Sequence, residues 1–241
     1  MKAAKYGFCW VSGICALPPV SLKWPPRLFS FPSMQDTSAQ ISSLVHRVNL
    51  ALPGNEKHIV AFISARSGEG TSTVARAFAE GLAAETQRKL LMIDAGPLDA
   101  ARFVTDGINP GKGIIDAAAA GEDPMKAIFA IEQNVYLGRW LGQDKNRAAA
   151  GKLLNDRAFW EKLQAEFDTI VIDAPSPQTS SDGIALTARA DATIVVVEAE
   201  ATRQPVVESL CNTLKAAGAK IIGTVLNKRR MHIPEKIYAR L

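Results

Sequence analysis

The residues best suited to chemistry lie in a short glycine-containing segment, residues 64–73, with the sequence SARSGEGTST. The apolar run HIVAFIS precedes the glycines and has the composition of a buried strand. Gly68 and Gly70 can adopt backbone angles that are closed to other residues. After them, apolar residues spaced three and four apart predict a helix. A strand, a glycine turn and a helix N-terminus direct backbone N–H groups toward one point, which predicts a pocket for an anion.

This order of elements is typical of the P-loop, whose usual ligand is a nucleotide phosphate. The standard motif has a Lys that reaches the β- and γ-phosphates, and Thr71 stands in its place here. Either Arg66 supplies the missing charge, or the site binds nucleotide weakly and hydrolyses it poorly. Taken alone, the segment is equally compatible with a tight turn and a helix cap. The residues predicted to contact nucleotide are Arg66, Ser67, Gly68, Glu69, Gly70, Thr71, Ser72 and Thr73.

Polar side chains end three other apolar runs. Asp94 ends LLMID, Asp173 ends TIVID and Asn227 ends IIGTVLN. An apolar strand that ends in an acid is the Walker B arrangement, in which the carboxylate holds magnesium or its water beside the P-loop. We predict Asp94 and Asp173 as catalytic residues, and Ser72, Asp94 and Asp173 as the residues that face the metal. Any one acid alone would more often be a cap or turn residue, so the prediction depends on their joint placement.

Strand-like runs alternate with helical patterns along the chain, and this alternation predicts the fold class. The predicted strands are 58–64, 90–94, 134–138, 169–172, 192–197 and 220–226, and the predicted helices are 38–50, one beginning at 71, a short one within 107–121, 147–167 and 204–217. We expect an α/β, P-loop NTPase-like domain with a mostly parallel central sheet and helices on both faces. Ligands of such sheets bind at the carboxyl ends of the strands, where the glycine loop, the two acids and Asn227 all fall.

Composition excludes several classes of function. The chain has 241 residues, 47% hydrophobic and 22% charged, which is ordinary for a globular protein. Its net charge of +4 is too small to indicate a nucleic-acid partner, and none is expected. Three His and three Cys residues are scattered, without metal or disulfide spacing. No stretch has the roughly 20 apolar residues that a membrane span needs.

The first 33 residues differ from the remainder, because they hold five of the 13 prolines and two of the four tryptophans. We interpret residues 1–33 as a disordered leader or an over-called start, with Met34 as the working one. A weak membrane-surface anchor is the alternative. Residues 34–241 are expected to form one domain.

From about Ser38 to Arg230, the ordered motifs resemble the MinD/ParA group of P-loop proteins. Within that group they look most like the cytoplasmic domain of bacterial tyrosine (BY) kinases, which control capsular and exopolysaccharide synthesis and export. The segments that carry the likeness are ISARSGEGTSTVA, LLMIDAGP, FDTIVIDAPS followed by SDGIAL, DATIVVVEAEATR and GAKIIGTVLNKRR. In this likeness LLMIDAGP stands at the Walker A′ strand and FDTIVIDAPS at Walker B.

The sequence departs from the family at several positions. Besides Thr71, the second Asp expected after Asp94 is replaced by Gly96, and an Arg expected near Leu98 is absent. The tyrosine-rich tail that the kinases phosphorylate is reduced to Tyr238. In the 38–50 helix, Ile41 and Leu44 occupy the positions where the family has charged residues that join subunits into a ring.

The resemblance implies a degenerate member of exopolysaccharide or capsule biosynthesis that binds ADP or ATP with Mg²⁺, with Asn227 meeting the adenine edge. It also implies a cytoplasmic protein, or one peripheral to the inner membrane, whose partner is an inner-membrane polysaccharide co-polymerase or chain-length protein; a homo-oligomer is compatible with it. One rival is an active tyrosine autokinase or ATPase that uses Arg66 in place of the Lys. The others are a MinD/ParA-type positioning ATPase and a scaffold that has discarded nucleotide.

Overall fold

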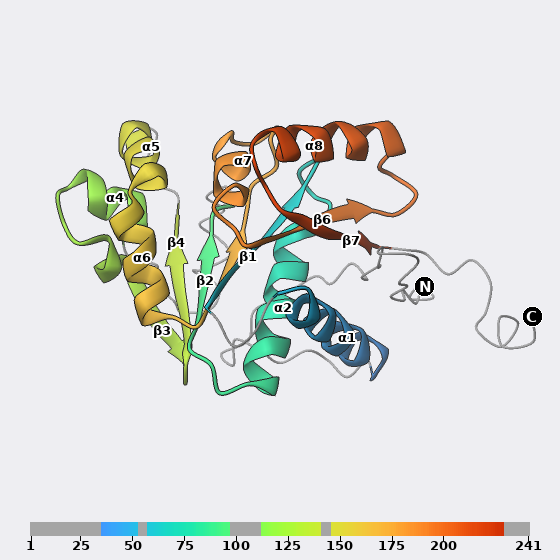
Figure 1. Ribbon diagram of the computed structural model, residues 1–241, viewed down its shortest axis with the longest axis horizontal. Coiled ribbons are helices and arrows are strands. Elements are labelled where there is room, and N and C mark those ends of the chain that lie inside the picture. Colours follow the sequence, from blue (N-terminus) through green and yellow to red (C-terminus); the bar gives the residue numbers. More distant parts are fainter. Residues whose placement is uncertain (1–34, 53–56, 97–111, 141–145, 229–241) are drawn as a thin grey trace, which may run out of the picture.

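The computed structural model describes residues 35–52, 57–96, 112–140 and 146–228. The predicted leader 1–33 and the positions Leu98 and Tyr238 lie outside the described residues. Within the described part, helices cover both sides of one central sheet (Figure 1). None of the described helices is long and apolar enough to cross a membrane.

Seven strands form the sheet in the order β3-β4-β2-β5-β1-β6-β7. Their bounds are β1 His58–Ser64, β2 Leu90–Asp94, β3 Ile128–Glu132, β4 Val135–Arg139, β5 Thr169–Asp173, β6 Ala192–Glu198 and β7 Ile221–Asn227. Every pairing is parallel except that of β3 with β4, so the sheet is mostly parallel, as predicted. In the middle of the sheet, every residue of β1, β2 and β5 is buried, which explains their unbroken apolar sequences.

Alternate residues of the strands enter two separate cores, because successive side chains of a strand point to opposite faces. In β1, Ile59, Ala61 and Ile63 face one core, whereas Val60 and Phe62 face the other. Helices α1 (Gln35–Ala51) and α2 (Thr71–Glu85) cover the second core. The first core lies under α4 (Ile114–Ala119), α5 (Arg147–Asn155), α6 (Arg157–Glu166), α7 (Asp182–Thr187) and α8 (Gln204–Ala216), with the short 3₁₀ helix η1 (Pro124–Ala127) beside it.

One sequence prediction about elements was wrong, and one strand was not predicted. Residues 147–167 were expected to form one helix, but Asp156 lies between α5 and α6, and its side chain accepts hydrogen bonds from the N–H groups of Ala158 and Phe159. An Asp that caps a new helix in this way competes with continuing the old one. The antiparallel edge strand β3 was not predicted, and none of its residues is fully buried.

Helix α1 packs against the domain through the apolar positions that its helical spacing predicted. Ile41, Leu44, Val45 and Val48 are all buried against the α2 side of the sheet. Burying four such side chains contributes on the order of 1.5–3 kcal/mol each before the cost of ordering the chain is subtracted. Ile41 and Leu44 therefore serve the core of this domain.

Candidate nucleotide-binding site

The glycine loop lies between the end of β1 at Ser64 and the start of α2 at Thr71. Gly68 and Gly70 have φ angles of +87° and +92°, in the left-handed region that only glycine adopts at low cost. Gly70 is constrained further, since a Cβ built on it would lie 2.0 Å from the side-chain nitrogen of Asn227. The sequence prediction of a strand–turn–helix unit is confirmed.

Two residues of β7 and its end hold the carbonyl groups of this loop. The Nδ2 of Asn227 donates to the carbonyl oxygen of Glu69 at 2.7 Å, and the Nζ of Lys228 donates to that of Gly68 at 2.5 Å. A trans peptide group carries its C=O and N–H on opposite sides. Fixing these carbonyls toward β7 therefore turns the N–H groups of Glu69 and Gly70 away from it, toward the position where an anion would bind.

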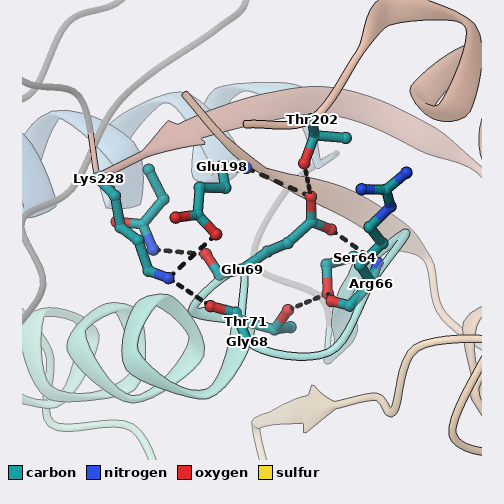
Figure 2. A network of polar contacts seen from close by, with 9 residues as sticks. Ser64, Arg66, Gly68, Glu69, Thr71, Glu198, Thr202 and Lys228 are labelled. Atoms are coloured by element: carbon teal, nitrogen blue, oxygen red, sulfur yellow. Dashed lines mark hydrogen bonds and ion pairs between the residues drawn. The ribbon is translucent and has the colours of Figure 1, made fainter. Parts of the chain in front are cut away.

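The side chain of Glu69 is an internal brace for the loop and is only 2% exposed. One carboxylate oxygen accepts the backbone N–H of Arg66 at 2.8 Å. The other accepts the N–H of Glu198 at 3.5 Å and the hydroxyl of Thr202. Figure 2 shows these contacts joining the loop to the end of β6 and the segment after it. The structure gives the carboxylate of Glu69 a bracing role. The contact of Glu69 with nucleotide stays a prediction, which its backbone N–H could make.

Thr71, in the position of the usual Lys, turns its side chain into the loop. Its hydroxyl donates to Ser64 Oγ at 2.7 Å, and Ser64 Oγ donates to the carbonyl of Arg66 at 2.9 Å. Thr71 is buried, so this hydroxyl completes the interior of the turn. The side chain of Arg66 is exposed and extends to the Thr202 side of the loop in Figure 2, away from Thr71.

The remaining loop residues lie at the mouth of the site. Ser67 is exposed, while Ser72 and Thr73 are partly buried in the first turn of α2. Their backbone N–H groups belong to the helix N-terminus, where the helix dipole favours an anion. These residues are available for the contacts that the sequence predicts.

The two predicted acids end neighbouring strands at the same edge of the sheet. Asp94 of β2 and Asp173 of β5 are partners in register, and Asp173 is in turn the partner of Phe62 in β1. Both acids are buried, at 8% and 2% exposure. Asp94 Oδ1 accepts the backbone N–H of Gly96 at 3.0 Å. The structure thus brings both acids to the strand ends beside the loop, as expected from the topology.

A basic residue that sequence reasoning missed lies beside Asp94. Arg76 of α2 is 8% exposed, and its guanidinium is 3.6 Å from Asp94 Oδ2. The sequence signal was a charged residue inside the run TSTVARAFA, whose neighbours Val74, Ala75 and Ala77 are all buried. Such a position is costly for an unpaired charge, so a buried Arg there indicates an acidic partner.

One further acid lies close to this arginine. Burial raises the pKa of Glu80 from its ordinary value of 4.5 to about 8, against the lowering effect of the Arg76 guanidinium and with a smaller raising effect from Glu132. Glu80 follows Arg76 by one helical turn. Helix α2 therefore carries two ionisable side chains, Arg76 and Glu80, one helical turn apart.

Asn227 is positioned as predicted, at the end of the β7 strand, but its amide already has loop partners. It is 1% exposed, donates to Glu69 and accepts the N–H of Lys228. Its proposed contact with an adenine edge stays a prediction. The next residue, Lys228, donates to the carbonyl of Gly68 and forms an ion pair of 3.1 Å with Glu198.

Comparison with known proteins agrees with this site. Residues 57–210 match the family described as cellulose biosynthesis protein BcsQ. The chain belongs to the BcsQ family. The matched residues include the glycine loop, Arg76 and both acids.

Two relatives extend the assignment. The tyrosine-protein kinase CpsD of Streptococcus agalactiae is 29% identical over 188 residues, which cover 76% of this chain and 80% of CpsD. The succinoglycan biosynthesis transport protein ExoP of Rhizobium meliloti is 28% identical over 187 residues, 75% of this chain and 23% of ExoP. The predicted likeness to BY kinases of exopolysaccharide biosynthesis is confirmed.

Solved structures confirm the fold class. The kinase domain of the Escherichia coli tyrosine kinase ETK superposes with a TM-score of 0.71 at 17% identity, covering 91% of this chain and 92% of that domain. The septum site-determining protein MinD of Pyrococcus horikoshii, in complex with Mg-ADP, gives 0.57 at 23% identity, with 76% of each chain covered. The domain is therefore a P-loop NTPase-like α/β fold.

The described residues fit a nucleotide better than they fit its metal. Within the described ranges, no three His, Cys, Asp or Glu side chains gather to hold a metal ion. Ser72 and Asp173 are compatible with magnesium, whereas Asp94 suits it less, because its two oxygens already face the Gly96 N–H and the Arg76 guanidinium. A dication at Asp94 would lie close to a buried positive charge.

Proposed function

We propose that this protein is a nucleotide-binding, catalytically weak relative of the BY kinases that regulates exopolysaccharide biosynthesis. The observation that carries the proposal is the glycine loop between β1 and α2, in which Asn227 and Lys228 hold the carbonyls of Glu69 and Gly68. The N–H groups of Gly70 and Glu69 in the same two peptide groups therefore point to the opposite side, where an anion can bind. Backbone amides and the N-terminus of α2 bind phosphate without any basic side chain. ADP and ATP are the ligands that such a loop suits.

Weak catalysis is inferred from the charges that the site lacks. Phosphoryl transfer depends on positive charge around the γ-phosphate and on metal held by carboxylates. Thr71 replaces the Lys and is hydrogen-bonded inside the loop, and Asp94 faces Arg76. Each lost electrostatic contact is worth about 3 kcal/mol if it is comparable to a lost oxyanion donor. Binding depends on many amides and is reduced far less.

The partner that we propose is an inner-membrane polysaccharide chain-length or export protein, met from the cytoplasmic side. Support comes from the relatives, one of which is a succinoglycan biosynthesis transport protein of which this chain matches only 23%. A chain of this kind would act through its nucleotide-dependent shape on a separate membrane component. Homo-oligomerisation is compatible with this role.

Isothermal titration with ADP and ATP tests the nucleotide step. We expect binding by the wild type and none by Gly70→Asp, because a side chain at Gly70 would collide with Asn227 at 2.0 Å. Gly121→Asp is the matched control, since Gly121 also has a positive φ, +72°, but open space around it. Identical titrations for wild type and Gly70→Asp, with no heat from either nucleotide, would remove nucleotide from the proposal.

A phosphate-release assay separates this proposal from an active enzyme. The wild type is expected to release phosphate at the background rate that Asp173→Ala also gives. Release that depends on Asp173 and on Arg66 would instead support an ATPase or autokinase in which Arg66 replaces the Lys. The exposed position of the Arg66 side chain does not favour that alternative.

A further inference from the structure

Among the residues that the structure describes, Arg76 is a buried basic side chain, and it is paired with Asp94, a predicted metal ligand. Its guanidinium lies 3.6 Å from Asp94 Oδ2, with side-chain exposures of 9% and 10% for the two partners. The pair is therefore shielded from the solvent that weakens surface ion pairs. Its location, between the helix that starts at the nucleotide loop and the edge that carries both acids, links it to the site.

We propose that Arg76 takes over the electrostatic role of the divalent cation, so that this protein binds ADP without Mg²⁺. The inference rests on the proposed nucleotide binding and adds how the charge of the site is balanced. A nucleotide diphosphate brings negative charge to an edge that already holds Asp94 and Asp173. Something positive must offset that charge, and in this chain the Lys that would contribute is absent.

The geometry explains why an arginine can do this from α2. Side chains of a helix lean toward its N-terminus, so a long side chain at position 76 extends back toward Thr71 and the loop. Helix α2 packs over β1, β2 and β5 on one face of the sheet, which brings Arg76 to the carboxyl end of β2. A guanidinium is always charged and is less strongly hydrated than an ammonium, which suits a buried ion pair.

A second consequence concerns Asp94. Because one of its oxygens faces the guanidinium and the other accepts the Gly96 N–H, its carboxylate is already engaged before any ligand arrives. In this site Asp94 holds Arg76 in place, whereas a magnesium site would use Asp94 to hold the metal. The two roles predict opposite effects of Asp94→Asn on ADP affinity.

ADP titrations in millimolar MgCl2 and in excess EDTA test the proposal on the full chain. For the wild type, we expect the dissociation constants for ADP in MgCl2 and in EDTA to agree within about threefold. A tenfold difference would correspond to about 1.4 kcal/mol.

Arg76→Gln should weaken ADP binding in EDTA by about tenfold or more, the size of one charge-assisted contact, and Mg²⁺ should recover most of the loss. Arg76→Lys keeps the charge and should keep the Mg²⁺ independence. Arg157→Gln, at an exposed pair on α6, is the control and should change nothing.

Asp94→Asn provides a second test of the role of Arg76, which can be used if Arg76→Gln does not fold. Asp94→Asn removes the negative charge 3.6 Å from the guanidinium, so more of the positive charge of Arg76 is available to offset the diphosphate. ADP binding should therefore tighten by about threefold or more. Weaker binding of ADP by Asp94→Asn in MgCl2 would overturn the proposal, because it would identify Asp94 as a metal ligand.

The two proposals fail in different ways. ADP binding by the wild type in MgCl2 but not in EDTA would overturn the role of Arg76 and leave nucleotide binding intact. No binding of ADP in either condition would overturn both.

Discussion

The two sides of the nucleotide loop differ in their polar contacts. On the β7 side, Asn227, Lys228 and the Glu69 carboxylate brace the loop with hydrogen bonds to its backbone. On the acid side, the expected Lys is absent and Asp94 faces Arg76. The shape of the phosphate cradle is thus retained where it depends on backbone, while the charged groups that catalysis needs are changed.

This difference indicates that binding and catalysis can be separated within one P-loop. A cradle built from amides needs only glycines at positive φ and partners for the carbonyls, and both are present. Catalysis needs charge at the γ-phosphate, which is a property of side chains. Substitutions on the β7 side should therefore affect the fold and the cradle, and substitutions on the acid side should affect charge and its pH dependence.

The largest expected effect is on the braced side. Glu69→Ala removes a buried acceptor and leaves the N–H of Arg66 and the hydroxyl of Thr202 without their partner. We expect the free energy of unfolding to fall by about 3–5 kcal/mol, since each unsatisfied buried donor costs about 1–3 kcal/mol. Urea unfolding followed by circular dichroism measures this.

Glu161→Ala is the control for that experiment, because Glu161 forms an exposed helical i,i+4 pair with Arg157. Its effect should stay below about 0.5 kcal/mol. A Glu69→Ala loss no larger than the Glu161→Ala loss would show that the carboxylate does not brace the loop.

The next largest effect concerns pH and belongs to the acid side. Burial raises the pKa of Glu80 to about 8, so the folded state binds its proton more tightly than the unfolded state, where the value is near 4.5. The protonated form is the stable one in the fold. The contribution of Glu80 to stability is therefore complete below about pH 4.5 and is lost as the pH rises toward 8.

Glu80→Gln cannot ionise and tests this directly. We expect it to be more stable than the wild type at pH 8.5, by on the order of 2–4 kcal/mol, and nearly equal to it at pH 4.5, since each pKa unit represents about 1.4 kcal/mol. Thermal or urea unfolding of both proteins across this range gives the difference. A gap between the two proteins that does not grow with pH would contradict the assignment.

The same contrast explains what the sequence could predict. Strands β1, β2 and β5 are unbroken apolar runs because both faces are covered, and the acids that end them were therefore easy to place. The register of Asp94 beside Asp173 follows from a parallel sheet in which β2 and β5 are neighbours. Elements with such strong patterns were predicted correctly, and the 147–167 helix failed only at Asp156, a residue that can be exposed in a helix or can cap one.

Long-range polar pairs were not predictable in this way. Arg76 and Asp94 are 18 residues apart, and Glu69 and Thr202 are 133 apart. No periodicity marks which charged residue will meet which loop, because the pairing depends on how strands are ordered in the sheet. Lys228 illustrates this limit: it looks like one of three basic residues in a solvated loop, yet it reaches Gly68, 160 residues earlier.

The smallest expected effect on stability is that of Lys228→Met, on the braced side of the loop. Lys228→Met keeps the aliphatic stem and removes the ammonium that binds Gly68 and Glu198. The Lys228 side chain is 26% exposed, so solvent compensates in part and stability should fall by only about 0.5–1 kcal/mol. ADP affinity should fall about threefold, because the carbonyl of Gly68 loses one of the contacts that turn the next amide toward the phosphate.

Asn227→Ala acts on the adjacent carbonyl from a fully buried position, so it should weaken ADP binding more than Lys228→Met does. The opposite order would mean that the ammonium of Lys228 itself contacts the nucleotide.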